Sequence, residues 1–115
     1  FLSAWVALPS HRALAAIVDG RLAGFGVLRP CRVGAKIGPL YADTPAIAER
    51  LVRALCAQAG AGPVSLDVPE VNPAAVALAQ SFGWTAQFET ARMYAGTAPA
   101  VDLPRLYGVT TFELG

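Results

Sequence analysis

The sequence predicts a single α/β (α+β) domain in which helices pack on a mixed, mostly antiparallel β-sheet. The chain has 115 residues, enough for one hydrophobic core, and residues 1–115 are taken as one domain. Apolar residues make up 55% of the chain and charged residues 15%, a balance typical of compact globular proteins. Short apolar runs alternate with two segments of helical periodicity, and together they predict the order β-β-β-α-β-α-β-β.

Three strands open this order. The apolar run at residues 13–18 ends at Asp19-Gly20, a pair typical of a type I′ turn, because both central residues of that turn have φ above zero. The partner strand covers residues 21–31, and the sequence AKIGPLYA at residues 35–42 is the third strand. Pro39 in this strand has no N–H for a ladder hydrogen bond, which indicates either a bulge or a sheet edge.

Two helices and three further strands follow. Residues 45–59 carry apolar side chains at helical spacing, and the Gly-rich segment after them ends the helix. The sequence VSLDV, residues 64–68, is apolar enough for a strand that is covered on both faces. Residues 73–82 form the second helix, between Asn72 as N-cap and Gly83 as C-terminal stop. The last two strands are expected at residues 85–94 and 108–114.

Charge and cysteine content exclude several classes of function. The formal net charge is +1 and the basic residues are scattered, so no basic stripe indicates nucleic-acid binding. No apolar run approaches the ~20 residues of a membrane span. Two distant cysteines and one histidine predict neither a metal site nor a disulfide framework. Free thiols without a secretory signal indicate a cytoplasmic protein, and the missing initiator Met indicates a fragment of a longer chain.

The junction between the third strand and the first helix, Asp43 to Ala48, is a candidate anion site. The first backbone N–H groups of a helix have no intrahelical partner and can bind a phosphate. Pro45 lacks an N–H, but Ile47 and Ala48 can still present theirs. The alternative is that Thr44 or Asp43 caps the helix with its own oxygen and fills the place of the anion.

Two motifs make the chain resemble the GNAT superfamily of N-acetyltransferases over roughly residues 13–95. The segment NPAAVALAQSFGW matches the family pattern N-x-x-A-x-x-L-Y-x-x-x-G-F at Asn72, Ala75, Leu78 and Gly83, with Trp84 in place of Phe. The segment DTPAIA aligns with the pyrophosphate loop Q/R-x-x-G-x-G/A of that family. The resemblance therefore implies acetyl-CoA as cofactor, bound by Asp43, Thr44, Ala46, Ile47, Ala48 and Asn72.

The same alignment shows where the chain departs from the family. Asp43 places a negative charge where the family has Gln or Arg, next to a pyrophosphate that is also negative. At about 4 Å two like charges repel by roughly 1–4 kcal/mol, depending on screening. Ala46 replaces a glycine, and Ala79 replaces the tyrosine that protonates the leaving thiolate in the family.

The candidate catalytic groups are a carboxylate and a phenol. Asp67 lies in a predicted buried strand, where it is either a general base or the partner of an arginine such as Arg92. Glu70 is a second carboxylate. Tyr94 and Tyr41 are the candidate acids in place of the missing tyrosine, or else half-buried strand residues. Arg29, Arg32 and Lys36 are expected around a loop, as solvated charges or as contacts to a nucleotide 3′-phosphate.

Three functions remain open at this point. More narrowly, the chain resembles the C-terminal half of bacterial proteins that carry two GNAT domains. This resemblance implies that the partner is an N-terminal GNAT domain of the same protein or a homodimer partner. In the first function, the chain transfers acetyl from acetyl-CoA to a primary amine of a small molecule or protein. In the second, it is a degenerate half that shapes the cleft of a partner domain. In the third, it binds a small molecule unrelated to CoA in a cleft between split strands.

Overall fold

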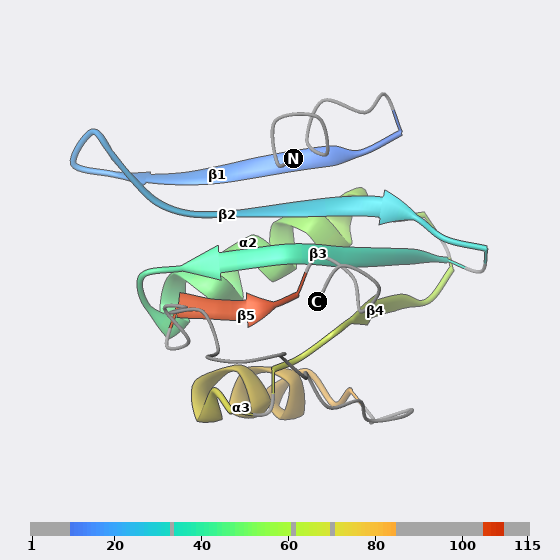
Figure 1. Ribbon diagram of the computed structural model, residues 1–115. Coiled ribbons are helices and arrows are strands. Elements are labelled where there is room, and N and C mark those ends of the chain that lie inside the picture. Colours follow the sequence, from blue (N-terminus) through green and yellow to red (C-terminus); the bar gives the residue numbers. More distant parts are fainter. Residues whose placement is uncertain (1–9, 33, 61, 70, 85–104, 110–115) are drawn as a thin grey trace, which may run out of the picture.

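The computed structural model describes residues 10–32, 34–60, 62–69, 71–84 and 105–109. Five strands form one sheet, α2 crosses one face of it, and α3 lies beside β5 (Figure 1). This arrangement confirms the predicted α+β fold class. The elements are β1 (Arg12–Val18), β2 (Arg21–Pro30), β3 (Ala35–Ala42), α2 (Pro45–Gln58), β4 (Val64–Leu66), α3 (Pro73–Ser81) and β5 (Leu106–Gly108).

The β1–β2 hairpin has the predicted turn. Asp19 has φ +52° and Gly20 has φ +75°, as a type I′ turn requires, and β1 and β2 pair antiparallel on either side of it. Local turn chemistry is sufficient to set this register, because the two strands are joined by only these two residues.

The β2–β3 pair contains the predicted bulge. Gly26 lies opposite Leu40 and Leu28 lies opposite Ile37, so the two residues Gly38 and Pro39 face a single residue of β2. Pro39 is buried, and β3 has neighbours on both sides, so the alternative of a sheet edge is wrong. The bulge places a residue without an N–H inside the sheet and leaves the ladder intact on both sides of it.

One edge of β3 is shared by two short strands. Its first half, Ala35–Ile37, pairs parallel with β4. Its second half pairs antiparallel with β5, with Leu40 opposite Gly108 and Tyr41 opposite Leu106. Figure 1 shows β4 diverging from β3 while β5 lies beside the end of β3. The space at which β3 and β4 separate is therefore occupied by β5.

The core lies between α2 and the sheet. The buried face of α2 consists of Ala48, Leu51, Val52 and Leu55. These side chains pack into one cluster with apolar residues of β2 and β3 and with Ala75 and Leu78 of α3. A Cβ on Gly26 would lie 2.8 Å from the Leu55 Cδ1 atom, so the missing side chain allows the helix to approach β2 closely. Gly83, with φ +72°, follows the end of α3 as predicted.

The predicted C-terminal strands agree with the structure only in part. The strand expected at residues 85–94 lies outside the described residues. The strand expected at residues 108–114 is placed differently, because β5 begins at Leu106, and only its first two predicted residues are described. The reason is that Leu106 and Tyr107 are both almost fully buried, so the ladder with β3 starts before the β-branched residues that marked the strand in the sequence. In the described part of the chain, no helix is long and apolar enough to cross a membrane.

Candidate functional site

The junction of β3 and α2 is fixed by both backbone and side-chain bonds. The Asp43 N–H donates to the Ala23 carbonyl oxygen of β2 at 2.8 Å. Thr44 has extended backbone angles and is the N-cap of α2, and Pro45 follows as its first residue. The Thr44 hydroxyl oxygen accepts from the Ile47 N–H at 3.2 Å. The helix therefore begins with a Thr-Pro cap that is anchored to the neighbouring strand.

The first-turn N–H groups are mostly engaged within the chain. The Ile47 N–H bonds to the Thr44 side chain, and the Ala48 N–H bonds to the Thr44 carbonyl oxygen at 3.1 Å. Pro45 has no N–H, which leaves that of Ala46, an exposed residue. The expectation that Ile47 and Ala48 present free N–H groups is wrong, because the ordinary helical bond takes one and the cap takes the other. The capping alternative is confirmed, with Thr44 and not Asp43 as the cap.

Asp43 faces a cation. Its Oδ1 atom lies 2.7 Å from Nη2 of Arg105, the residue directly before β5. Arg105 is 53% exposed and Asp43 26%, so the pair lies at the surface. Arg105 supplies a guanidinium beside the position where the family carries Gln or Arg. The negative charge of Asp43 is therefore compensated within the chain.

Asn72 makes two different bonds from one buried amide. It is 3% exposed, and its Oδ1 accepts from the Ala74 N–H at 3.1 Å, which caps α3 as predicted. Its Nδ2 donates to the Leu106 carbonyl oxygen of β5 at 2.9 Å. The second role is absent from the sequence analysis. The residue type is the signal for this second bond. An Asn side chain that caps a helix with its oxygen still has two N–H donors, whereas a Thr cap has one donor and an ionised Asp cap has none.

Asp67 is held in a buried ion pair. It is 8% exposed, and its Oδ2 atom lies 2.7 Å from Nζ of Lys36, whose side chain is 19% exposed. The expected arginine partner is therefore a lysine, and Arg92 lies outside the described residues. Lys36 lies in β3, within the strand predicted at residues 35–42, but it is paired with Asp67 and is not the solvated charge that was expected. Because its ammonium occupies one carboxylate oxygen, a substrate ammonium has to approach the other.

Of the two phenol candidates, Tyr41 lies in the part of the chain that the structure describes. Tyr94 lies outside the described residues, as does Glu70. Tyr41 is half-buried in β3, with its ring 5.2 Å from that of Phe25, which agrees with the alternative of a packed strand residue. Tyr107 in β5, which the sequence analysis did not consider, is 1% exposed, and burial raises its pKa. The structure brings Tyr107 into the core and gives it no access to a substrate.

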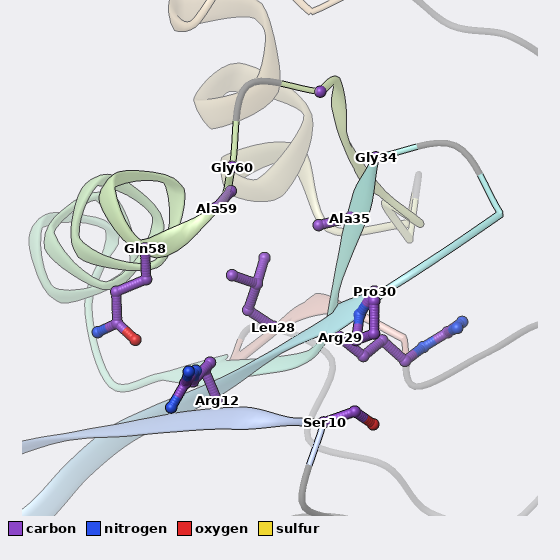
Figure 2. Close-up of a pocket in the computed structure, with 11 residues that line it drawn as sticks. Ser10, Arg12, Leu28, Arg29, Pro30, Gly34, Ala35, Gln58, Ala59 and Gly60 are labelled. Atoms are coloured by element: carbon purple, nitrogen blue, oxygen red, sulfur yellow. The ribbon is translucent and has the colours of Figure 1, made fainter.

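A cavity lies at the other end of α2. It has a volume of about 370 Å³ and is lined by Gln58, Ala59 and Gly60 together with residues of β1, β2 and β3. Figure 2 shows Leu28 pointing into it, Arg12 near Gln58, and Arg29 pointing away. A helix of 14 residues is about 20 Å long, which separates this cavity from Thr44. None of the residues that the resemblance assigned to acetyl-CoA lines it.

The space between the split strands is filled. β5 pairs with β3 at the point where β4 leaves it, and the backbone of Gly108 lies between Leu66 and Leu40. An open cleft between β3 and β4, on which the third function depended, is therefore not present in the part of the chain that the structure describes.

Comparison with known proteins identifies the family. Residues 1–108 match the family described as "Acetyltransferase (GNAT) domain". The chain is also similar to "Holothin acyltransferase" from Pseudoalteromonas sp. (strain SANK 73390), with 29% identity over 98 residues. That alignment covers 84% of this chain and 33% of the relative, so the chain spans about a third of the length of that protein. The match over nearly the whole chain, on a mixed sheet packed by two helices, shows that the chain belongs to the GNAT acetyltransferase domain family.

Proposed function

We propose that this chain works in the transfer of an acetyl group from acetyl-CoA to a primary amine of a small molecule or protein. Its family and the acyltransferase to which it is similar support this reaction class. The reaction needs a bound thioester, a base for the ammonium, donors for the oxyanion and an acid for the thiolate.

The first need, a seat for the thioester cofactor, is not met by those assigned groups that the structure describes. Of the N–H groups in the first turn of α2, those of Ile47 and Ala48 are already bonded and only that of Ala46 is left. Asp43 is paired with Arg105, and Asn72 is bonded to β5. We therefore infer that this chain is the GNAT half that shapes the substrate cleft, and that a second GNAT domain, in the same protein or in a homodimer partner, holds acetyl-CoA.

The occupied first turn of α2 is the single observation that carries this assignment. A phosphate at a helix N-terminus needs N–H groups that point at it without another acceptor. The Thr44 cap supplies an acceptor of its own, and capping of this kind stabilises a helix by about 1 kcal/mol. A pyrophosphate has to displace the hydrogen bond between Thr44 and the Ile47 N–H before it can bind that N–H itself.

A second candidate function, acetyl transfer by this chain itself, is favoured by one observation. Arg105 places a guanidinium beside the loop position at which the family carries Gln or Arg. If Arg105 turned from Asp43 to a pyrophosphate, it would supply the positive group that the sequence lacks there. In that function Asp67 is the base and Tyr94 the acid, and the amine approaches Oδ1 of Asp67, because Oδ2 is paired with Lys36.

The two candidates are separated by titration of the chain with acetyl-CoA in a calorimeter. The cleft-shaping role predicts no binding up to millimolar acetyl-CoA, whereas micromolar affinity would refute it for this chain. In a protein that carries both GNAT domains, Ala46→Asp places a negative charge at the first-turn residue of α2 whose N–H has no partner among the described residues. The cleft-shaping role predicts an unchanged KM for acetyl-CoA, equal to that of the control Ala54→Asp, which alters another exposed alanine of α2. A tenfold rise in KM with Ala46→Asp alone would assign the cofactor to this loop.

A further inference from the structure

The cavity at the C-terminal end of α2 lies on the face of the sheet that this helix covers. Arg12 of β1 is directly opposite Leu28 of β2 in the antiparallel ladder, and residues opposite each other have their side chains on the same face. Leu28 points into the cavity, and Arg12 lies near Gln58, the last residue of α2 (Figure 2). The register of the β1–β2 hairpin therefore places a guanidinium beside the end of the helix.

The cavity has an apolar floor and a polar rim. Leu28 is 4% exposed, whereas Arg12 and Gln58 are exposed side chains. The turn after α2 leaves the space open, because a Cβ on Gly60 would meet no atom within 4 Å. The volume of about 370 Å³ equals that of about twelve water molecules of roughly 30 Å³ each, so a small molecule of about a dozen non-hydrogen atoms fits.

The charged residues that line this cavity are all basic. They are Arg12 and Arg29, without an Asp or Glu, and Arg29 points away in Figure 2. Asp19 lies in the turn at the opposite end of β1. The other carboxylates among the described residues are paired with other cations, in Asp43–Arg105, Glu49–Arg53 and Asp67–Lys36. Within the described part of the chain, the Arg12 guanidinium therefore has no carboxylate partner at this cavity.

The rim is suited to a carboxylate. A guanidinium presents a planar fork of N–H donors that matches the two oxygens of a carboxylate, and the Gln58 amide can supply a further donor. The C-terminus of α2 opposes an anion with a partial charge of about half an elementary charge, which the full charge of Arg12 exceeds. A phosphate ester carries about −1.5 to −2 at pH 7, more than a single guanidinium balances.

We propose that this cavity binds the acyl-accepting molecule, and that this acceptor is a small primary amine that also carries a carboxylate. Arg12 and Gln58 hold the carboxylate at the rim, the carbon chain covers Leu28, and the amine at its other end stays outside the cavity. The acceptor role rests on the proposed function, whereas the carboxylate site rests on the cavity alone. The cleft-shaping role then has a defined task, because this chain holds the acceptor while the other GNAT domain holds acetyl-CoA.

Three probes test the ligand class in the absence of acetyl-CoA. The first is 6-aminohexanoate, with a carboxylate at one end and a primary amine at the other. Hexylamine lacks the carboxylate, and 6-aminohexyl phosphate replaces it with a phosphate. Each is titrated into the chain labelled with ¹⁵N, and the backbone amides of Arg12, Leu28 and Ala59 and the side-chain amide of Gln58 report binding at the cavity by NMR.

Two variants with matched controls test the residues. Arg12→Gln removes the guanidinium, and Arg50→Gln makes the same change on α2. Gln58→Glu places a carboxylate on the rim, and Gln80→Glu makes the same change on α3. All four altered side chains are exposed, so these variants are expected to keep the fold.

We expect 6-aminohexanoate to bind the unaltered chain with millimolar affinity and to shift the cavity amides. Hexylamine should bind about tenfold more weakly, because it makes no charge-assisted hydrogen bonds at the rim. Arg12→Gln and Gln58→Glu should each weaken binding of 6-aminohexanoate by about tenfold, with no change in the two controls. The proposal is overturned if hexylamine or the phosphate binds as tightly, if Arg12→Gln equals Arg50→Gln, or if no probe shifts these amides at tens of millimolar.

Turnover in a protein that carries both GNAT domains separates this proposal from the proposed function. Arg12→Gln should raise the KM for 6-aminohexanoate about tenfold relative to Arg50→Gln and leave the KM for acetyl-CoA unchanged. If the protein acetylates hexylamine as efficiently as 6-aminohexanoate, the acceptor assignment is overturned and acetyl transfer stands. If it acetylates no amine, the proposed function fails, and with it the acceptor role, whereas the carboxylate site measured by NMR stands.

Discussion

Replacing Asn72 with alanine is expected to cost the chain at least about 2–3 kcal/mol of its free energy of unfolding. The change removes the side-chain acceptor of the Ala74 N–H at the start of α3, and loss of such a cap costs about 1 kcal/mol. It also removes the 2.9 Å bond to the Leu106 carbonyl oxygen. Because Asn72 is 3% exposed, water cannot replace this bond without entering the core, and an unsatisfied buried acceptor costs about 1–3 kcal/mol.

Urea unfolding, followed by circular dichroism and by tryptophan fluorescence, measures this loss. Thr44→Ala is the matched control, because it removes an exposed helix cap whose side-chain bond is to Ile47 of α2, and it should cost only about 1 kcal/mol. Asn72→Asp separates the two contributions, since the carboxylate can still cap α3 and cannot donate to Leu106. If Asn72→Ala cost no more than Thr44→Ala, or if Asn72→Asp were as stable as the unaltered chain, the bond to β5 would contribute nothing and the reasoning would be refuted.

The remaining predictions concern the buried charge pair, the buried phenol and the close approach of two strands. Lys36→Met should cost about 3 kcal/mol in urea unfolding, because it leaves the Asp67 carboxylate buried without its cation, and adding Asp67→Leu should recover at least half of the loss. Burial raises the pKa of Tyr107 above its ordinary value of 10.0. The stability it contributes is therefore complete below about pH 10 and is lost as pH rises through the folded pKa, and Tyr107→Phe should reduce that alkaline loss in unfolding curves between about pH 8 and 11. In Gly24→Ala a Cβ would lie 2.7 Å from a backbone oxygen of β3, which should lower stability by about 1–3 kcal/mol, whereas Gly60→Ala, in open space, should leave the urea midpoint unchanged.

Elements that depend on nearby residues were predictable from the sequence. The Asp19-Gly20 turn, the bulge at Pro39 and both helix starts follow from the backbone preferences of one to four residues, and the structure has each of them where it was expected. The Glu49–Arg53 pair, with its 3.1 Å contact, is another case of this kind, because helical spacing alone brings the two side chains together.

Contacts between distant residues were not predictable in the same way. Asn72 and Leu106 are 34 residues apart, and no local pattern connects them. Arg105 is also far from Asp43 in the sequence, so nothing in the sequence around Asp43 indicates its partner. Lys36 was expected to be a solvated charge, and its pairing with Asp67 becomes apparent only from the parallel register of β3 and β4.

The occupied first turn of α2 and the occupied edge of β3 follow from a general requirement on buried polar groups. Backbone N–H and C=O groups that lose contact with water need partners, and a helix start or a split sheet edge exposes several of them. In a GNAT domain that holds acetyl-CoA, the ligand can satisfy such groups. In this chain the Thr44 hydroxyl satisfies the helix start and β5 satisfies the sheet edge.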